Sequence, residues 1–140
     1  MELRSEARFD VVSYLSDEWC ALTLEKAAQI QARPGATVNL QYNIVGTPRG
    51  DEFYYWIVKD GRLADCQMGK VDDAEVTLLQ AFDDAVMIQK DELGAEVAFM
   101  QGRMKVEGNL AKLMALLPVT SAPDYKAVMA SLAQETDYAI

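Results

Sequence analysis

Few residues in this sequence have the types and spacing needed for chemistry. The chain contains no histidine, which is the commonest general base and a frequent metal ligand in proteins. Serine–histidine and cysteine–histidine nucleophile systems are therefore excluded, as are histidine-based zinc sites. The two cysteines, Cys20 and Cys66, lack metal-ligand spacing and are too few for a disulfide framework, so we interpret them as buried thiols. We expect no cofactor and no metal.

Two pairs of adjacent acids remain as candidates for acid–base or metal-binding chemistry. They lie at positions 72–73 and 83–84, and all four residues are aspartates. Adjacent acids in turns far more often cap helices or carry solvating charge. We therefore predict no catalytic residue here, and we expect Asp83 or Asp84 to cap a helix that ends at about Lys90.

Two basic residues, Arg103 and Lys105, alternate with apolar residues. This alternation is typical of a strand whose charged side chains point to solvent. If the strand borders a cavity, either base could instead pair with the carboxylate or phosphate of a ligand headgroup. Both interpretations remain open from the sequence.

The composition predicts one folded domain with an acidic surface. Of the 140 residues, 51% are hydrophobic, which is enough for a substantial core. The 22 acids outnumber the 13 bases and give a formal net charge of −9. This charge opposes binding to nucleic acid and to anionic membranes, so we expect no nucleic-acid partner and no stable membrane insertion. The charged first residues lack the apolar run of a secretory signal, and we expect a cytoplasmic protein.

The hydrophobic pattern predicts an α+β fold. Ser16, followed by two acids, is the expected N-cap of a helix that runs to about Gln31. Asp60–Gly61 is a strong signal for a two-residue hairpin turn. We predict strands at about 37–44, 53–58, 62–68, 74–79 and 103–107, and further helices at about 84–90, 95–100, 110–117 and 121–136.

The last two helices have specific boundary signals. Asn109 is the expected N-cap of the first, whose apolar residues recur at helical spacing, and Pro118 is expected to end it. Ser121 and Asp124 resemble a capping box for the second. Both helices are amphipathic and therefore need an apolar surface to cover.

Residues 99–110 read Phe-Met-Gln-Gly-Arg-Met-Lys-Val-Glu-Gly-Asn-Leu. This segment resembles the hallmark of the sterol carrier protein type two domain family. There, an aromatic residue and a glycine precede a strand of alternating basic and apolar residues, which leads through a glycine and an acid or amide into an apolar helix. The stretches 74–84 and 15–19 are also similar to family members, so that the likeness covers most of residues 10–120.

The resemblance implies a five-stranded mixed, mainly antiparallel sheet with helices on one face and an apolar cavity between the two layers. It also implies a site for a fatty acid, a fatty acyl chain, a sterol or a similar lipid, without covalent chemistry. We expect a single domain over residues 1–140, with a core at about 10–120 and a C-terminal capping helix at about 121–136. Flexible and apolar side chains suit such a cavity, and the candidate lining residues are Tyr42, Phe53, Tyr55, Met68, Phe82, Phe99, Met100, Met104, Leu110, Leu113, Met114 and Leu117.

The predicted strand at 53–58 is apolar or aromatic on both faces, so its inward face is ambiguous. We place Phe53 and Tyr55 inward, although Tyr54 and Trp56 could point there instead. The face left outside could support a homodimer or partner docking.

Two other classes of function remain open. A small enzyme acting on an apolar metabolite would need at least two ionisable groups converging in the cavity. An interaction module would have a filled core and would use the Tyr54 and Trp56 face for docking. The sequence does not identify the ligand.

Overall fold

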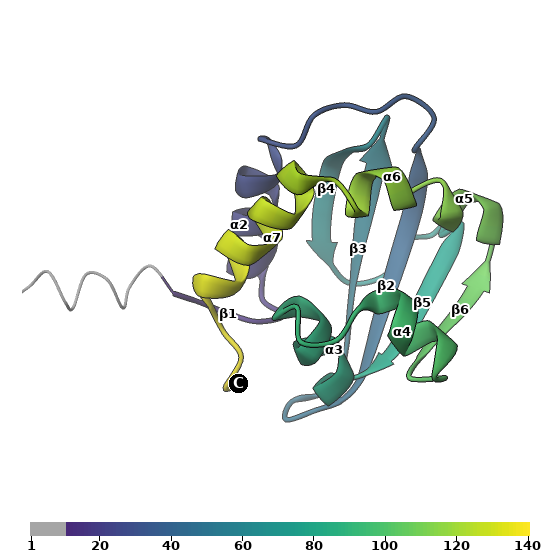
Figure 1. Cartoon of the computed structure of the whole chain (residues 1–140). Coiled ribbons are helices and arrows are strands. Elements are labelled where there is room, and N and C mark those ends of the chain that lie inside the picture. Colours follow the sequence, from purple (N-terminus) through teal and green to yellow (C-terminus); the bar gives the residue numbers. More distant parts are fainter. Residues whose placement is uncertain (1–10) are drawn as a thin grey trace, which may run out of the picture.

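The computed structural model describes residues 11–140, and Figure 1 shows the arrangement of their helices and strands. The strands are β1 (Val12–Ser13), β2 (Val38–Thr47), β3 (Gly50–Lys59), β4 (Arg62–Met68), β5 (Val76–Ala81), β6 (Met104–Gly108) and β7 (Thr136–Asp137). The helices are α2 (Asp17–Ala27), α3 (Phe82–Gln89), α4 (Ala95–Met100), α5 (Leu110–Met114), α6 (Leu117–Thr120) and α7 (Pro123–Gln134).

The main sheet has five strands in the order β4-β3-β2-β5-β6. The central strands β2 and β5 run parallel, and the other neighbours are antiparallel. The predicted five-stranded mixed sheet is therefore confirmed. The hairpin signal is also confirmed, because Asp60 (φ 50°) and Gly61 (φ 78°) form the two-residue turn between β3 and β4 with the positive φ angles that such turns require.

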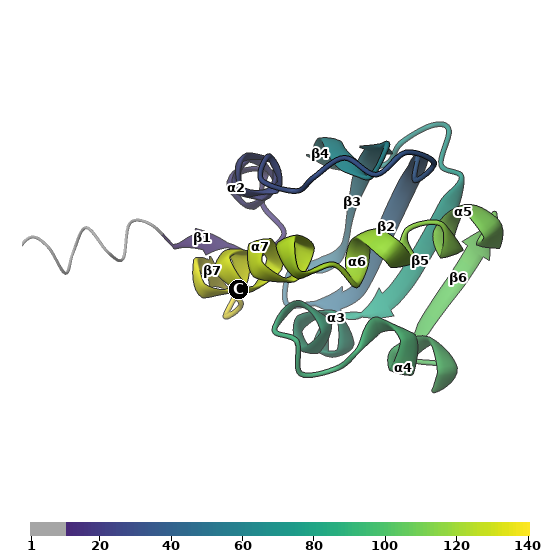
Figure 2. The ribbon, with the colours of Figure 1, turned by 45° about the horizontal axis from the view of Figure 1, so that its top comes forward.

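The helices cover one face of this sheet. Figure 2 shows α7, α6 and α5 in a row across the strands, with α3 and α4 below them. Ser16 caps α2 as predicted, because its Oγ accepts a hydrogen bond from Trp19 N at 3.1 Å. The core between helices and sheet includes Trp19, Leu40 and Tyr54, all at most 2% exposed.

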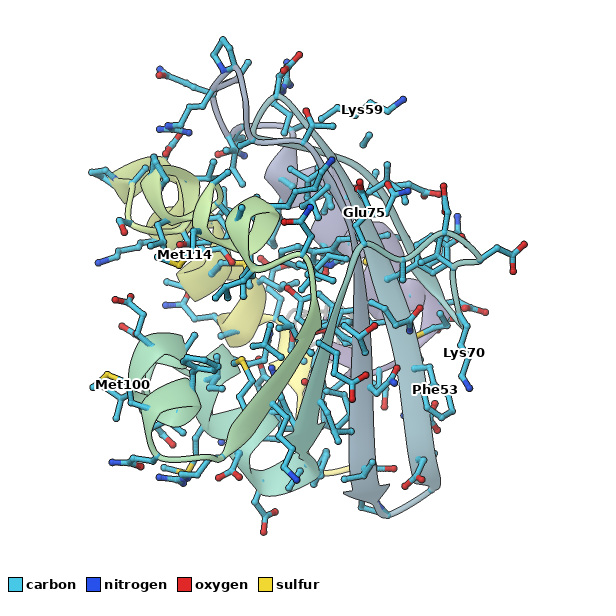
Figure 3. The ribbon with its side chains drawn as sticks, turned by 90° about the vertical axis from the view of Figure 1, so that its right-hand side faces the viewer. Phe53, Lys59, Lys70, Glu75, Met100 and Met114 are labelled. Carbon is cyan, nitrogen blue, oxygen red and sulfur yellow. The ribbon has the colours of Figure 1, made fainter. Side chains whose placement is uncertain are left out.

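The inward face of β3 is the opposite of the one we predicted. Tyr54 and Trp56 are buried against the helices, whereas Phe53 and Tyr55 alternate with them and lie on the outer face. Lys70 lies over the Phe53 ring at 4.5 Å, and Figure 3 shows both residues on the side away from the helices. Both faces of β3 are apolar, so its own pattern could not select the inward one.

The first helix was expected to run to about Gln31 but ends at Ala27, and two other predicted helix boundaries are also wrong. The helix that Asn109 caps ends at Met114, and Pro118 stands in the first turn of the separate helix α6. A first-turn proline costs little because its missing N–H would have no partner within the helix. Helix α3 begins at Phe82, and Ala81 at its N-cap position forms no side-chain capping hydrogen bond. Asp83 and Asp84 therefore stand in the first turn of the helix instead of capping it.

The predicted capping box of the last helix is also wrong. Helix α7 starts at Pro123 without a side-chain cap. Asp124 instead accepts hydrogen bonds from Gln31 N at 2.8 Å and Arg33 Nη2 at 2.9 Å, which fastens α7 to the segment after α2. The short parallel pair β1–β7 was not predicted from the sequence.

Candidate functional site

On the inward face of β2, every apolar side chain but one is buried. Val38, Leu40 and Ile44 are at most 2% exposed, but Tyr42, which lies between Leu40 and Ile44 on the same face, remains partly accessible. Strand β2 is the central strand of the sheet. Partial exposure at this position means that the helical layer does not close completely over the middle of the sheet.

Tyr42 belongs to an apolar row that crosses the strands. It stands beside Leu78 of β5, which in turn stands beside Val106 of β6. Leu78 is buried, whereas Val106 is partly accessible like Tyr42. Leu113 of α5 is a third partly buried side chain that packs against the same core. We call Tyr42, Val106 and Leu113 the inner patch.

Aromatic packing fixes the Tyr42 ring. It stacks on Tyr54 with ring centroids 4.4 Å apart and an interplanar angle of 7°. Trp56 meets it edge-on at 5.3 Å, and Trp19 meets Tyr54 edge-on at 5.0 Å. These offset and edge-on contacts are the favourable geometries for aromatic pairs. The inner patch therefore has a rigid aromatic floor on β2 and β3.

The ionisable groups beside this floor are tyrosines and the buried thiols of Cys20 and Cys66. Burial raises the pKa of Tyr42 and of Tyr54 well above the usual tyrosine range, and it raises the pKa of Tyr125 to about 12. All three are neutral at physiological pH, because their protonated form is uncharged. An uncharged aromatic surface suits contact with an apolar molecule better than proton transfer.

Two basic residues on either side of β6, Arg103 and Lys112, are engaged in ion pairs. Arg103 donates to Asp84 Oδ1 from Nη2 at 2.7 Å and from Nε at 2.9 Å. Lys112 lies 2.7 Å from Glu75, and this hydrogen bond, together with one from Asn39 N, lowers the pKa of the Glu75 carboxyl. Neither base is placed as a free partner for a ligand headgroup.

The two helices beside β6 carry exposed apolar side chains. Met100 of α4 is 82% exposed and Met114 of α5 is 53% exposed. Figure 3 shows these two methionines on the helix-covered side of the sheet, near opposite ends of β6. The remaining members are Val97, Phe99 and Leu110, each about half exposed. We call these five residues the apolar rim.

A comparison with protein families places this geometry in a known group. The model of the SCP-2 sterol transfer family matches residues 16–120, which include the whole main sheet and α2 to α6. The chain belongs to the SCP-2 sterol transfer family. The family resemblance seen in the sequence is thereby confirmed. A comparison with curated proteins found no match.

Solved structures of SCP-2 proteins share the fold. The chain is similar to the crystal structure of sterol carrier protein 2 like 2 from Aedes aegypti, with 20% identity, a TM-score of 0.55, and coverage of 71% of this chain and 93% of that one. A protein from Thermus thermophilus, described as possibly a sterol carrier protein, gives 15% identity, a TM-score of 0.65, and coverage of 85% and 89%. A crystal structure of sterol carrier protein 2 gives 13% identity, a TM-score of 0.65, and coverage of 89% and 99%.

The structure separates the predicted lining residues of this SCP-2 domain into three groups. Tyr42, Met68, Phe82, Met104, Leu113 and Leu117 are buried or half-buried, Phe99, Met100, Leu110 and Met114 are exposed in the apolar rim, and Phe53 and Tyr55 lie on the outer face. Val106 was not predicted, although its alternation with Lys105 and its spacing of two from Met104 place it on the inward face.

Two surface hollows lie away from the inner patch. One, of about 290 Å³, lies between α2 and α7 and is lined by Lys26, Asp124 and Ser131 among others. The second, of about 320 Å³, lies beside β5 and β6 near Arg103 and Asp84. Neither is the apolar cavity between sheet and helices that the family resemblance implies, and that cavity stays a prediction.

Residues 11–140 contain neither a candidate metal site nor a candidate membrane-spanning helix. No group of three or more cysteines or acids is arranged to hold a metal ion in this range. None of its helices is long and apolar enough to cross a membrane.

Proposed function

We propose that this SCP-2 family protein binds a lipid over the inner patch and carries it without covalent change. The partial accessibility of Tyr42, on the otherwise buried inward face of the central strand β2, is the observation that carries this proposal. A ligand that lies along the row from Tyr42 through Leu78 to Val106 would remove the remaining apolar surface from water.

The chemistry of the patch favours an elongated apolar ligand. Each methylene group that it removes from water contributes about 0.8 kcal/mol, so an acyl chain can bind well without a polar contact. The aromatic floor is rigid, whereas Leu113 and the methionines of the rim have several rotamers and can adapt to the ligand. Affinity would then depend on chain length more than on the headgroup.

We infer that the ligand enters between α4 and α5. Val97, Leu110 and Met114 are exposed on these two helices, and Val106 of the inner patch lies on the strand between them. Exposed apolar side chains beside an accessible interior surface provide a continuous path for an apolar molecule. We further propose that residues 1–140 act as one domain, in which Asp124 of α7 holds the segment after α2 and Tyr125 of α7 lies near Tyr42.

A catalytic role is less favoured. Acid–base chemistry needs a group that changes its protonation near neutral pH. The tyrosines beside the patch have raised pKa values, and the nearby Arg103 and Lys112 are held in ion pairs.

Native mass spectrometry of the purified protein, followed by solvent extraction, tests this proposal first. We expect a fatty acid or another lipid to copurify at near one-to-one stoichiometry. The delipidated protein should then bind fatty acids of increasing length with increasing affinity. A clean mass, together with no binding of added fatty acids or sterols, would overturn the proposal.

A further inference from the structure

Strand β6 forms a free edge of the main sheet. Within residues 11–140, β5 is its only neighbour. Asn109 N donates to Glu75 O at 2.9 Å, in the same antiparallel register that places Glu107 opposite Thr77 and Lys105 opposite Leu79. Because hydrogen-bonded positions alternate along a strand, the backbone groups of Met104, Val106 and Gly108 point to the free edge.

An exposed strand edge is a template for pairing with another chain. Two copies of β6 can pair antiparallel about a two-fold axis through Val106. In this register, each Val106 faces its symmetry mate, and Met104 faces Gly108 of the other copy. These are the residues whose backbone groups point outward, so their N–H and C=O groups would become paired.

The side chains select the same register. Lys105 and Glu107 project from β6 on the outer face, and neither forms an ion pair with another described residue. Pairing about Val106 places Lys105 of each copy opposite Glu107 of the other, at the closely spaced type of pair that has no backbone hydrogen bonds. A register centred on Lys105 would place the two Lys105 side chains opposite each other, and one centred on Glu107 would do the same with the two Glu107 side chains, so both registers oppose like charges.

In the same arrangement, the apolar rim of each copy would contact the apolar rim of the other copy. A two-fold axis perpendicular to the sheet keeps the helices of both copies on one side. It also places α4, which precedes β6, beside α5 of the second copy, which follows β6. Met100 would then approach Leu110 and Met114 of the other copy. These are three of the most exposed apolar side chains among the described residues.

We propose that a second copy of this chain binds at the β6 edge, giving a two-fold dimer with a continuous sheet across the axis. The two copies are both acidic, with a formal charge of −9 each, so long-range repulsion opposes association at low salt. The dimer is therefore expected to form at physiological ionic strength, where this repulsion is screened over about 8 Å. The proposal does not depend on lipid binding.

Sedimentation velocity over a range of concentrations tests this dimer in delipidated protein. In Lys105→Glu, the new glutamate of each copy faces Glu107 of the other copy. In Glu107→Lys, the new lysine of each copy faces Lys105 of the other copy. Each single variant should raise the dimer dissociation constant about tenfold or more. The double variant, Lys105→Glu with Glu107→Lys, restores opposite charges in the same register and should restore the wild-type constant. Circular dichroism should show that all three variants remain folded, because both positions are exposed.

Three outcomes would overturn the proposal. The protein could remain monomeric up to millimolar concentration, or it could form a dimer that the single reversals do not weaken. A third is a monomer that instead sediments with phosphatidylcholine vesicles in a manner abolished by Met100→Lys, which would assign the rim to a lipid surface. Lipid binding by monomeric protein would leave the proposed function intact while excluding the dimer.

Discussion

The rings of Tyr42 and Tyr54 stack in nearly parallel planes, with centroids 4.4 Å apart and an interplanar angle of 7°. The two residues are direct neighbours on antiparallel strands β2 and β3. Tyr54 is 1% exposed, whereas Tyr42 keeps an accessible part. The pair thus joins the sealed core to the surface where we propose that lipid binds.

The assignment of faces on β3 can be tested by stability. Tyr54→Ala should lower the free energy of unfolding by about 3–5 kcal/mol, because it removes a buried aromatic ring and leaves a cavity. Tyr55→Ala removes the same atoms from the outer face and should cost about 1 kcal/mol. Urea denaturation measures both. Equal losses would contradict the inward placement of Tyr54.

Filling the inner patch should block ligand binding. Leu113→Trp adds bulk to the inner patch, at a half-buried position of α5 that packs against the core. We expect the affinity for a long-chain fatty acid to fall at least tenfold, with a small effect on stability. Ile57→Trp on the outer face of β3 is the matched control and should bind normally. Unchanged affinity in Leu113→Trp would place the ligand elsewhere.

Gly108 should resist substitution. Its φ angle is 107°, and a Cβ atom there would collide with the carbonyl oxygen of Glu75, the residue just before the neighbouring strand β5. Gly108→Ala should therefore cost more than about 2 kcal/mol. Gly46→Ala is the control, since φ is 73° but no atom lies within 4 Å of the added carbon, and it should cost about 1 kcal/mol. Thermal and urea unfolding compare the two, and equal costs would exclude the predicted collision.

Acid should weaken the attachment of α7. Hydrogen bonds from Gln31 N and Arg33 lower the pKa of the Asp124 carboxyl below its usual value near 4. A lowered folded-state pKa contributes stability above the unfolded-state pKa, and this contribution is lost as the pH falls through the folded-state value. We expect the urea midpoint to drop as the pH falls from about 5 through the lowered folded-state pKa, and Asp124→Asn should flatten this dependence. An unchanged slope in the variant would show that other carboxyls account for it.

The elements with strong local signals could be predicted from the sequence. Ser16 and Asn109 cap their helices, and Asp60–Gly61 forms its hairpin turn, because each signal acts within a few residues. The order of motifs around residues 99–110 also led to the correct family. By contrast, Ser121, Asp124 and Pro118 carry local signals that tertiary contacts or neighbouring helices overrode.

The candidate site was only partly predictable. Tyr42 and Leu113 were expected at the site, but the exposure of Leu110 and Met114 was not. Helical spacing identifies the apolar face of a helix, but it does not show whether that face packs on the sheet or extends beyond the edge of the sheet. Val106 follows from strand alternation once Met104 is known to face inward.

The sequence by itself determined the fold class, the acidic surface and the absence of histidine chemistry, because composition and periodicity act locally along the chain. Only the tertiary structure decided which face of β3 is buried. Both faces are apolar, and the choice depends on Trp19 and Tyr42, which come from distant segments and pack against Tyr54. The tertiary structure also left Tyr42 accessible and β6 unpaired along one side, since both depend on where the helices and strands end relative to one another.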